Sequence, residues 1–366
     1  MRALLLGSSN SLMNPGYVPA MQECYGRYTG NLLTIDNYSV GASTCVWGLE
    51  AAKSCDLNIF DAIIIEFGVT DPPFIKRTSL EFWAACYESL LLYIRKKRPD
   101  IAIAIPFLRG LAGVNLECDS DMRFTLARLS EKYKATVFDV YDHLRGIASK
   151  DGKQIEDYYA DPAHYSRPSA TDVIGEFLGL GLSRVLEARR VGLPETCSHH
   201  APSYDLCNAK VLQAKDLLSL AGEISSREEK KFKNSAISRS SIAIYPEVPL
   251  DLKLSGQPIS FTVISTIDSG TLKIEIDDQE PIFYNTLTVP VRDAGRPFLF
   301  RPLFALPSAW DKRDVSDTSV KISVLAKPVS PQGHKILHQP GLLANASTNS
   351  PVGYLSSVLV RGAEGL

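Results

Sequence analysis

The chain has 366 residues, of which 45% are hydrophobic and 22% charged, a composition typical of a globular protein with a large apolar core. Its 39 Lys and Arg residues are balanced by 41 Asp and Glu residues, which gives a formal net charge of −2. Because basic and acidic residues are interspersed, the sequence offers no electrostatic footprint for nucleic acid or for an anionic membrane. No apolar run is long enough to span a bilayer, and the length predicts two domains.

The N-terminal segment does not have the pattern of an export signal. Its apolar stretch, Ala3–Leu6, is shorter than the hydrophobic region of a signal peptide and leads directly into a Gly-Ser turn. The seven cysteines are an odd number and show no Cys-x-x-Cys spacing. We therefore expect a cytoplasmic protein whose cysteines are reduced thiols, packed mostly in the core.

Residues 1–192 alternate strand-like and helix-like segments and are expected to form the first domain. Short runs rich in Ile, Leu and Val predict buried parallel strands at Ala3–Leu6, Leu32–Ile35, Ala62–Glu66, Ile101–Pro106 and Thr136–Val140. Apolar residues spaced three or four apart predict helices at Ser79–Arg95, Ser120–Lys134 and Pro168–Arg190. The alternation predicts an α/β domain with an open parallel sheet between two layers of helices.

Beyond residue 192 the pattern changes twice. Residues 193–234 are expected to form a linker that contains one connecting helix, Tyr204–Ala221, and a charged run, Arg227–Lys233, in a loop or solvated helix end. Residues 235–366 are expected to form an all-β sandwich or jelly roll. The β-prone runs that predict this second domain are Ile242–Tyr245, Ile259–Ser265, Thr271–Ile276, Leu287–Val291 and Val320–Leu325.

Ser9 stands in a small-residue turn directly after the first predicted strand. In α/β sheets, groups outside the carboxyl ends of the strands face bound ligands, and backbone N–H groups at such a turn can stabilise an oxyanion. Ser9 is therefore a candidate nucleophile. The alternative is that this Gly-Ser turn binds phosphate or only reverses the chain.

The segment Asp161-Pro162-Ala163-His164 follows the fifth predicted strand and precedes the last predicted helix of the first domain. An aspartate three residues before a histidine in a turn can bring its carboxylate to the imidazole Nδ1–H. The imidazole Nε2 then remains available to take the proton of a serine. The alternative is a surface histidine beside a helix N-cap, here Ser166 before Pro168.

Taken together, these segments resemble the sequence blocks of the SGNH (GDSL-like) hydrolase family. The first block, Gly-Asp-Ser-(Leu or Asn), is matched by Gly7–Asn10 and the second by Ser39–Thr44. The third block, Gly-x-Asn-Asp, is matched by Phe67–Asp71 and the fifth, Asp-x-x-His, by Asp161–His164. The resemblance covers residues 1–190 and implies a flavodoxin-like three-layer fold.

The resemblance also implies a serine-hydrolase mechanism without a metal or an organic cofactor. Ser9 is the implied nucleophile, His164 the general base, and Asp161 the residue that orients the imidazole. The implied oxyanion hole consists of the backbone N–H groups of Ser9 and Gly41, with a further donor from Thr70.

Two positions depart from the family blocks. Ser8 replaces the aspartate of the first block, where a serine can also hydrogen-bond the turn. Thr70 replaces the asparagine whose side-chain amide donates to the oxyanion, and a missing donor of this kind lowers the rate by about 10²–10³-fold. We expect Asn10, Asp71 and Arg109 to bind substrate.

Three functions are compatible with these residues. The favoured one is an esterase or deacetylase that cleaves acyl esters, acetyl above all, on a carbohydrate or small substrate. The alternatives are an O-acyltransferase of polysaccharide biosynthesis and a non-catalytic glycan-binding protein. The segment Cys197–His200 has no second ligand pair and is not predicted to bind metal. The expected partner is thus an acyl ester or glycan; the oligomeric state is not predicted.

Overall fold

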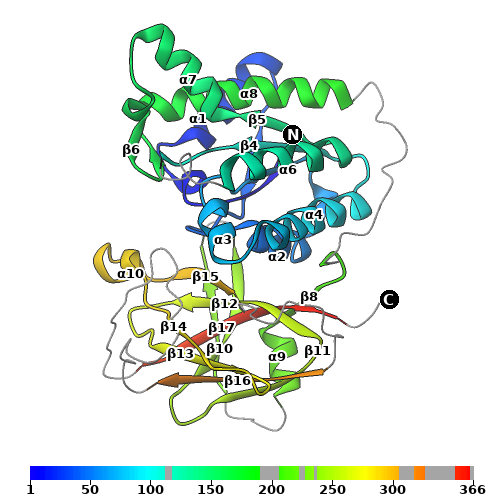
Figure 1. Ribbon diagram of the computed structural model, residues 1–366, viewed down its shortest axis with the longest axis vertical. Helices are drawn as coiled ribbons and strands as arrows, with labels where there is room; N and C mark the ends of the chain where they lie inside the picture. Colours follow the sequence, from blue (N-terminus) through cyan, green and yellow to red (C-terminus); the bar gives the residue numbers. More distant parts are fainter. Residues whose placement is uncertain are drawn as a thin grey trace. The chain divides into compact units, whose positions relative to one another are not determined.

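The computed structural model describes residues 1–111, 118–189, 206–221, 227–234, 237–304, 317–325 and 351–362. The chain divides into two compact units, Met1–Cys207 and Asn208–Leu366 (Figure 1). The Cys197–His200 segment lies outside the described residues.

The first unit is built on a parallel sheet with the strand order β2-β1-β3-β4-β5. The strands are β1 Arg2–Gly7, β2 Thr34–Asn37, β3 Ala62–Glu66, β4 Ala102–Phe107 and β5 Thr136–Asp139. This is the flavodoxin-like order, which confirms the predicted fold class. The order reverses between β1 and β3, and the carboxyl ends of strands at such a switch point are where α/β sheets bind ligands.

Helices cover both faces of this sheet (Figure 1). On one face lie α1 Tyr17–Thr29, α7 Val140–Asp151 and α8 Ser169–Arg189; on the other lie α2 Cys45–Lys53, α3 Asp71–Arg77, α4 Leu80–Lys97 and α6 Cys118–Lys132. Successive residues of β1 point to opposite faces of the sheet. Ala3 and Leu5 pack with α1 and α8, while Leu4 is buried toward the other helix layer. None of the described helices is both long and apolar enough to cross a membrane.

Two glycines on α8 allow it to pack closely against α1. A Cβ atom on Gly175 would lie 2.4 Å from the Cβ of Ala20 and 2.7 Å from the backbone nitrogen of Met21. A Cβ atom on Gly179 would lie 2.8 Å from the Met21 carbonyl oxygen. Since these neighbours belong to the α1 backbone or are directly attached to it, they cannot yield without displacing the helix.

Gly175→Ala is expected to lower the free energy of unfolding by about 1–3 kcal/mol, because overpacking outweighs the helix propensity that alanine gains. Gly146→Ala in α7 is the matched control, since a Cβ atom there has open space around it. The control is expected to raise stability by roughly 0.5–1 kcal/mol. Urea unfolding measures both changes. A stabilising effect of Gly175→Ala, as expected for Gly146→Ala, would contradict the close α1–α8 contact.

Short elements complete the first unit. They are the 3-10 helices η1 Asn10–Leu12, η2 Leu57–Ile59 and η3 Ile155–Tyr158, and the hairpin strands β6 Tyr159–Asp161 and β7 His164–Tyr165.

Free thiols are found at Cys24, Cys45, Cys55, Cys86 and Cys207, and all of these except Cys55 are buried. The expected packing of cysteines in the core is thus found at Cys24, Cys45, Cys86 and Cys207.

The second unit is an antiparallel β-sandwich, which confirms the predicted all-β region. One sheet has the order β15-β12-β17-β10-β9, with β8 also paired to β17, and the other has the order β11-β16-β13-β14. Inward-facing residues of both sheets form one core, including Leu252 of β11 and Phe261 of β12. The strands are β8 Lys210–Gln213, β9 Glu229–Lys233, β10 Ser238–Ile244, β11 Leu250–Ser255, β12 Gln257–Ser265, β13 Thr271–Ile276, β14 Ile282–Asn285, β15 Leu299–Phe304, β16 Asp317–Leu325 and β17 Gly353–Arg361.

Two segments assigned to the linker belong to this sandwich instead. The prediction of one helix over Tyr204–Ala221 is wrong in part, because β8 comes first and only Ala214–Leu220 forms a helix, α9. The charged run Arg227–Lys233 contains β9, which pairs with β10 and buries Phe232. Pairing with a neighbouring strand decides the conformation of such segments, and local charge does not reveal that partner.

A third difference lies at Leu287–Val291, which is predicted as a strand. Leu287 and Thr288 are followed there by the short helix α10, Val289–Asp293. Pro290 lies in the first turn of α10, where the missing N–H of proline is tolerated and its fixed φ favours a helix start.

Candidate active site

Ser9, His164 and Asp161 form one hydrogen-bonded line in the first unit. The Ser9 Oγ lies 2.9 Å from the His164 Nε2. The His164 Nδ1 lies 2.8 Å and 3.0 Å from the two carboxylate oxygens of Asp161. When Nδ1–H donates to a carboxylate, the imidazole presents an unprotonated Nε2 to the serine, which is the arrangement of a serine nucleophile with its general base.

The turn that carries Ser9 depends on a glycine at the end of β1. A Cβ atom on Gly7 would lie 2.5 Å from the Ser11 Oγ and 2.9 Å from the Ser39 Oγ. The Val40 N–H donates to the Gly7 carbonyl at 3.0 Å. The absence of a side chain at position 7 therefore lets the loop after β2 and the start of η1 close around the Ser9 turn.

The turn that carries Asp161 and His164 orients its own carboxylate. Asp161 Oδ1 accepts the backbone N–H groups of Ala163 at 2.8 Å and His164 at 2.9 Å. Burial raises the pKa of Asp161, but hydrogen bonds from Ala163 and His164 outweigh that effect and leave the pKa below its usual value. The Asp161 side chain is 51% exposed and that of His164 31%, so solvent reaches the base and its partner.

Asn10 connects the two turns. Its Nδ2 donates to the Ala163 carbonyl at 2.9 Å, and its Oδ1 accepts the Tyr165 N–H at 3.4 Å. The Asn10 side chain is buried. The Asn10 amide, which is predicted to bind substrate, thus connects the Ser9 turn to the turn that carries His164.

Asn10→Ala is expected to lower kcat for ester hydrolysis by about 10²-fold, because a displacement of about 1 Å between nucleophile and base has an effect of that size. KM should change much less, since the removed contacts lie within the protein. Steady-state kinetics with p-nitrophenyl acetate measure the two constants separately. A change confined to KM would instead support the direct substrate contact predicted for Asn10.

Asp71 and Arg109, also predicted to bind substrate, are buried and have partners within the protein. Asp71 accepts the Cys45 N–H at 3.1 Å and the Trp83 Nε1–H at 2.7 Å, and so ties the starts of α2 and α3 to α4. Arg109 forms a double hydrogen bond and ion pair with Asp119. Both side chains are thus held by partners within the protein, and their contact with substrate remains a prediction.

The backbone of Arg109 also holds the hairpin of the base. Its carbonyl accepts the hydroxyl groups of Tyr159 at 2.6 Å and Tyr165 at 2.8 Å. Nearby, a Cβ atom on Gly110 would lie only 2.9 Å from the Pro162 carbonyl oxygen. The loop after β4 therefore packs directly against the segment between Asp161 and His164.

Gly41 and Thr70, the other predicted oxyanion donors, lie in the loops after β2 and β3. A Cβ atom on Gly41 would meet nothing within 4 Å, and Ala42 beside it adopts a left-handed backbone with φ 53°. The Thr70 N–H and hydroxyl both donate to the Phe67 carbonyl, at 3.0 Å and 3.3 Å. Both donors of Thr70 are thus engaged within its own turn. The oxyanion roles of Gly41 and Thr70 remain predictions.

Glu66, the last residue of β3, lies fully buried beside the Ser9 turn. It accepts the Ser8 N–H at 3.2 Å, the Ser8 hydroxyl at 3.1 Å and the Ser11 hydroxyl at 2.8 Å. Burial raises the pKa of Glu66 to about 7. Sequence reasoning missed this residue, although a lone acid ending the apolar run Ala62–Glu66 was a visible signal.

Glu66 and Asp71 give the protein a predicted pH dependence of stability. Burial raises the pKa of each to about 7, above the values near 4 of unfolded carboxyl groups. Their contribution to stability is therefore fully present below the unfolded pKa and is lost as the pH rises through about 7.

We expect Tm to fall between pH 5 and pH 8. Over this range each carboxyl should lower the free energy of unfolding by an amount on the order of 1–3 kcal/mol. Glu66→Gln removes one of the two titrating groups and should make the Tm profile flatter over this range. Thermal unfolding at a series of pH values measures the slope, and an unchanged slope in the variant would contradict the assignment.

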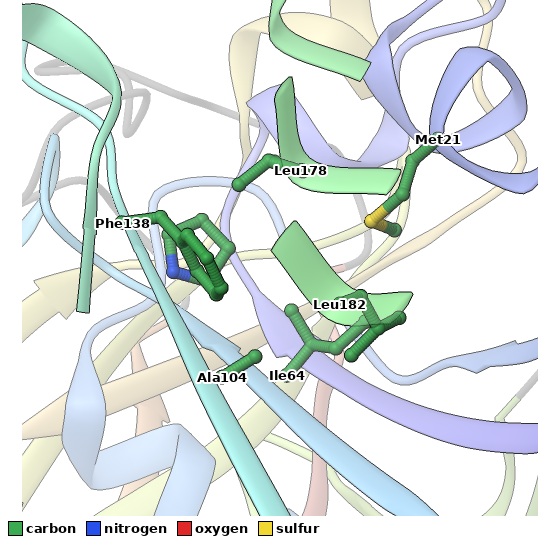
Figure 2. Close-up of a pocket in the computed structure, with 7 residues that line it drawn as sticks. Met21, Ile64, Ala104, Phe138, Leu178 and Leu182 are labelled. Carbon is green, nitrogen blue, oxygen red and sulfur yellow. The ribbon is translucent and has the colours of Figure 1, made fainter. Parts of the chain in front are cut away.

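An apolar gap also lies in the first unit, and the residues that line it do not include Ser9, His164 or Asp161 (Figure 2). Figure 2 shows Met21 of α1, Leu178 and Leu182 of α8, and Phe138 of β5 pointing into it. The gap has no room for a water molecule and is a packing defect of the core. No group of three or more His, Cys, Asp or Glu side chains in the described residues is arranged to hold a metal ion.

No protein-family model matches the sequence, and no curated protein matches it. Solved structures do match. A two-domain esterase active on acetylated mannans, crystallised with mannopentaose, is similar over 100% of this chain and 92% of its own, with 13% identity and a TM-score of 0.65. A second structure of a two-domain esterase active on acetylated mannans has 14% identity, the same coverage and a TM-score of 0.60.

A protein of the G-D-S-L family from Desulfitobacterium hafniense covers 50% of this chain and 98% of its own, with 17% identity. Its TM-score of 0.38 is too low to establish a common fold by itself. At 13–14% identity, the full-length likeness to the two-domain esterase establishes architecture and not activity. The chain thus shares the two-domain architecture of that esterase, with a flavodoxin-like α/β unit followed by a β-sandwich in this protein.

Proposed function

We propose that this protein is a serine esterase that removes acyl groups, acetyl above all, from a carbohydrate or a small ester. The observation that carries the proposal is the line from Ser9 Oγ through the His164 imidazole to the Asp161 carboxylate, with contacts of 2.8–3.0 Å. Such a line activates a hydroxyl for attack on an acyl carbon.

In the proposed first step, His164 Nε2 takes the proton of Ser9 Oγ as the oxygen attacks the ester carbonyl. The negative charge that develops on the carbonyl oxygen is stabilised by backbone N–H groups, for which Ser9 and Gly41 are the proposed donors. Collapse of the tetrahedral intermediate breaks the ester bond, and the imidazolium gives its proton to the leaving alkoxide. Asp161 stabilises the imidazolium and holds its orientation.

In the second step, water attacks the acyl-enzyme. His164 takes a proton from the water, the second tetrahedral intermediate collapses, and the proton returns to the Ser9 oxygen as the carboxylic acid leaves. The solvent exposure of His164 and Asp161 gives water access to this side of the line.

An acetylated glycan is the substrate class we propose. The support is the similarity over the whole chain, β-sandwich included, to an esterase described as active on acetylated mannans. Aromatic side chains can form a sugar-stacking platform, but Phe261, Phe283, Tyr284 and Phe300 of the β-sandwich are buried. The proposal therefore rests on the catalytic line and does not assign a sugar site to the sandwich.

The test is acetate release from acetylated mannan and from p-nitrophenyl acetate, each with and without an unacetylated oligosaccharide as acceptor. We expect acetate release from both substrates, with little acetyl transfer to the oligosaccharide. Transfer without hydrolysis would instead identify an O-acyltransferase. Glycan binding without release or transfer would identify a non-catalytic binding protein, and both enzymatic functions would fall.

A further inference from the structure

We propose that Glu66 is a positioning residue for the Ser9 nucleophile, supplying from β3 the carboxylate that stands at position 8 in the SGNH block. The inference rests on the proposed function, since it concerns the reactivity of Ser9. It goes further by assigning a role to a buried acid outside the three groups of the catalytic line.

The contacts of Glu66 surround the nucleophile along the chain. Its carboxylate accepts the backbone N–H and the hydroxyl of Ser8, one residue before Ser9, and the hydroxyl of Ser11, two residues after it. The Ser11 Oγ also lies 2.6 Å from the Tyr17 hydroxyl, so the turn is tied to α1 as well as to β3. A single carboxylate thus fixes both sides of the Ser9 turn.

The three short contacts converge on one carboxylate oxygen, Glu66 Oε2, while Oε1 lies 3.4 Å from the Ser8 hydroxyl. An ionised carboxylate oxygen accepts stronger hydrogen bonds than a neutral amide oxygen, which suits it to three converging donors. Glutamine at position 66 would offer these donors a neutral oxygen and weaken the hydrogen bonds that hold the buried turn. The Ser9 turn would then adopt a different conformation, which would displace Ser9 Oγ relative to His164 Nε2.

The same geometry explains why position 8 carries a serine. Ser8 Oγ lies 3.1 Å from Glu66 Oε2, so an aspartate at position 8 would bring two carboxylates into contact within a buried site. A serine at position 8 and an acid at position 66 therefore form a matched pair. The exchanged pair, an acid at 8 and an amide at 66, keeps one carboxylate in the same contact and restores a donor opposite it.

Four further titratable groups from the surrounding elements face the charge of Glu66: Tyr17 on α1, Asp71 on α3, Tyr87 on α4 and Tyr165 on β7. The burial of Glu66 raises its pKa to about 7. At pH 8.5 its carboxylate form therefore predominates, and the experiment is set at that pH.

The experiment compares the full-length wild type with Ser8→Asp, Glu66→Gln and the double variant. The readouts are the rate constant for covalent labelling of Ser9 by a fluorophosphonate, and kcat and KM for p-nitrophenyl acetate. We expect each single variant to lower the labelling rate and kcat by about 10–100-fold, with KM within about threefold of wild type. The double variant should recover to within about tenfold of wild type, which a merely structural role of either residue does not predict.

Leu144→Ala is the control for loss of stability, because Leu144 lies in the apolar core on α7 and takes no part in the hydrogen bonds of Ser8, Ser9 and Ser11. It should label at the wild-type rate despite a lower Tm. If Ser8→Asp does not fold, Ser11→Ala takes its place; this variant removes the shortest hydrogen bond to Glu66 and should slow labelling several-fold.

Wild-type labelling of Glu66→Gln would overturn the positioning role and leave the proposed function intact. A double variant slower than both single variants, or Ser11→Ala labelling at the wild-type rate, would overturn it as well. Failure of the wild type to label at all, or to hydrolyse the ester, would overturn the proposed function and this inference together.

Discussion

Ser9→Ala is expected to lower kcat/KM for p-nitrophenyl acetate by roughly 10⁴–10⁶-fold, because the alanine methyl group offers no oxygen to the acyl carbon. The Ser9 Oγ is the atom that faces His164 Nε2 at 2.9 Å. Its removal leaves only the residual acceleration that oxyanion donors and binding supply. Initial rates at substrate concentrations well below KM measure the change directly.

Ser183→Ala is the matched control for this substitution. The Ser183 hydroxyl donates to the Leu180 carbonyl within α8 and takes no part in the catalytic line. The control should retain wild-type kcat/KM, and both variants should keep a Tm close to that of the wild type. Ester hydrolysis by Ser9→Ala within about tenfold of wild type would mean that another group performs the attack.

Asp161→Asn is the second change with a large expected effect, a fall in kcat of about 10²–10⁴-fold. The asparagine oxygen would keep the hydrogen bonds from the N–H groups of Ala163 and His164, which now go to Asp161 Oδ1. Its NH₂ group would then face His164 Nδ1, where the second carboxylate oxygen now lies at 2.8 Å. An NH₂ donor at that point favours the tautomer with the proton on Nε2, which cannot accept the proton of Ser9.

The smaller fall in kcat within this range applies if water partly replaces the hydrogen bond that orients the imidazole. Such replacement is possible because the Asp161 side chain is exposed. Asp157→Asn is the control, because Asp157 accepts the Gln154 N–H in the preceding turn and does not contact His164. The pH profile of kcat distinguishes the two variants. A change of less than about threefold for Asp161→Asn would show that the carboxylate is not needed to orient the base.

The sheet of the first unit was largely predictable from sequence because its central strands, β1, β3 and β4, are buried on both faces. Ala62–Glu66 matches β3 at both ends, since the run of apolar residues is bounded by polar ones. Leu32–Ile35 anticipates β2 two residues too early, because Leu32 is apolar but exposed. The apolar run therefore locates the central strand β3 more closely than the edge strand β2.

The second unit was harder to predict, because its strands depend on partners distant in the sequence. Thr271–Ile276 coincides with β13, whereas β8 and β9 were taken as helix and loop. Lys210–Gln213 becomes a strand through pairing with residues 357–360 of β17, about 150 residues further along the chain. No local pattern encodes such a pairing.

For the site, turn position and spacing were enough to select Ser9, Asp161 and His164, which the structure brings together. They did not reveal the hydrogen bonds of Asn10, whose predicted substrate contact is still untested, because its partner in the protein is distant in the sequence. In the structure that partner is the Ala163 carbonyl, 153 residues away. Glu66 was missed for the same reason, since its bonds to the Ser9 turn join two different strands.

The most direct test of the central claim, that Ser9 is a nucleophile activated by His164, is the mass of the protein after reaction with a fluorophosphonate. We predict one adduct per chain, located on Ser9 by peptide mapping, and no adduct in His164→Ala under the same conditions. An unmodified wild-type protein, or an adduct on any residue other than Ser9, would contradict the account.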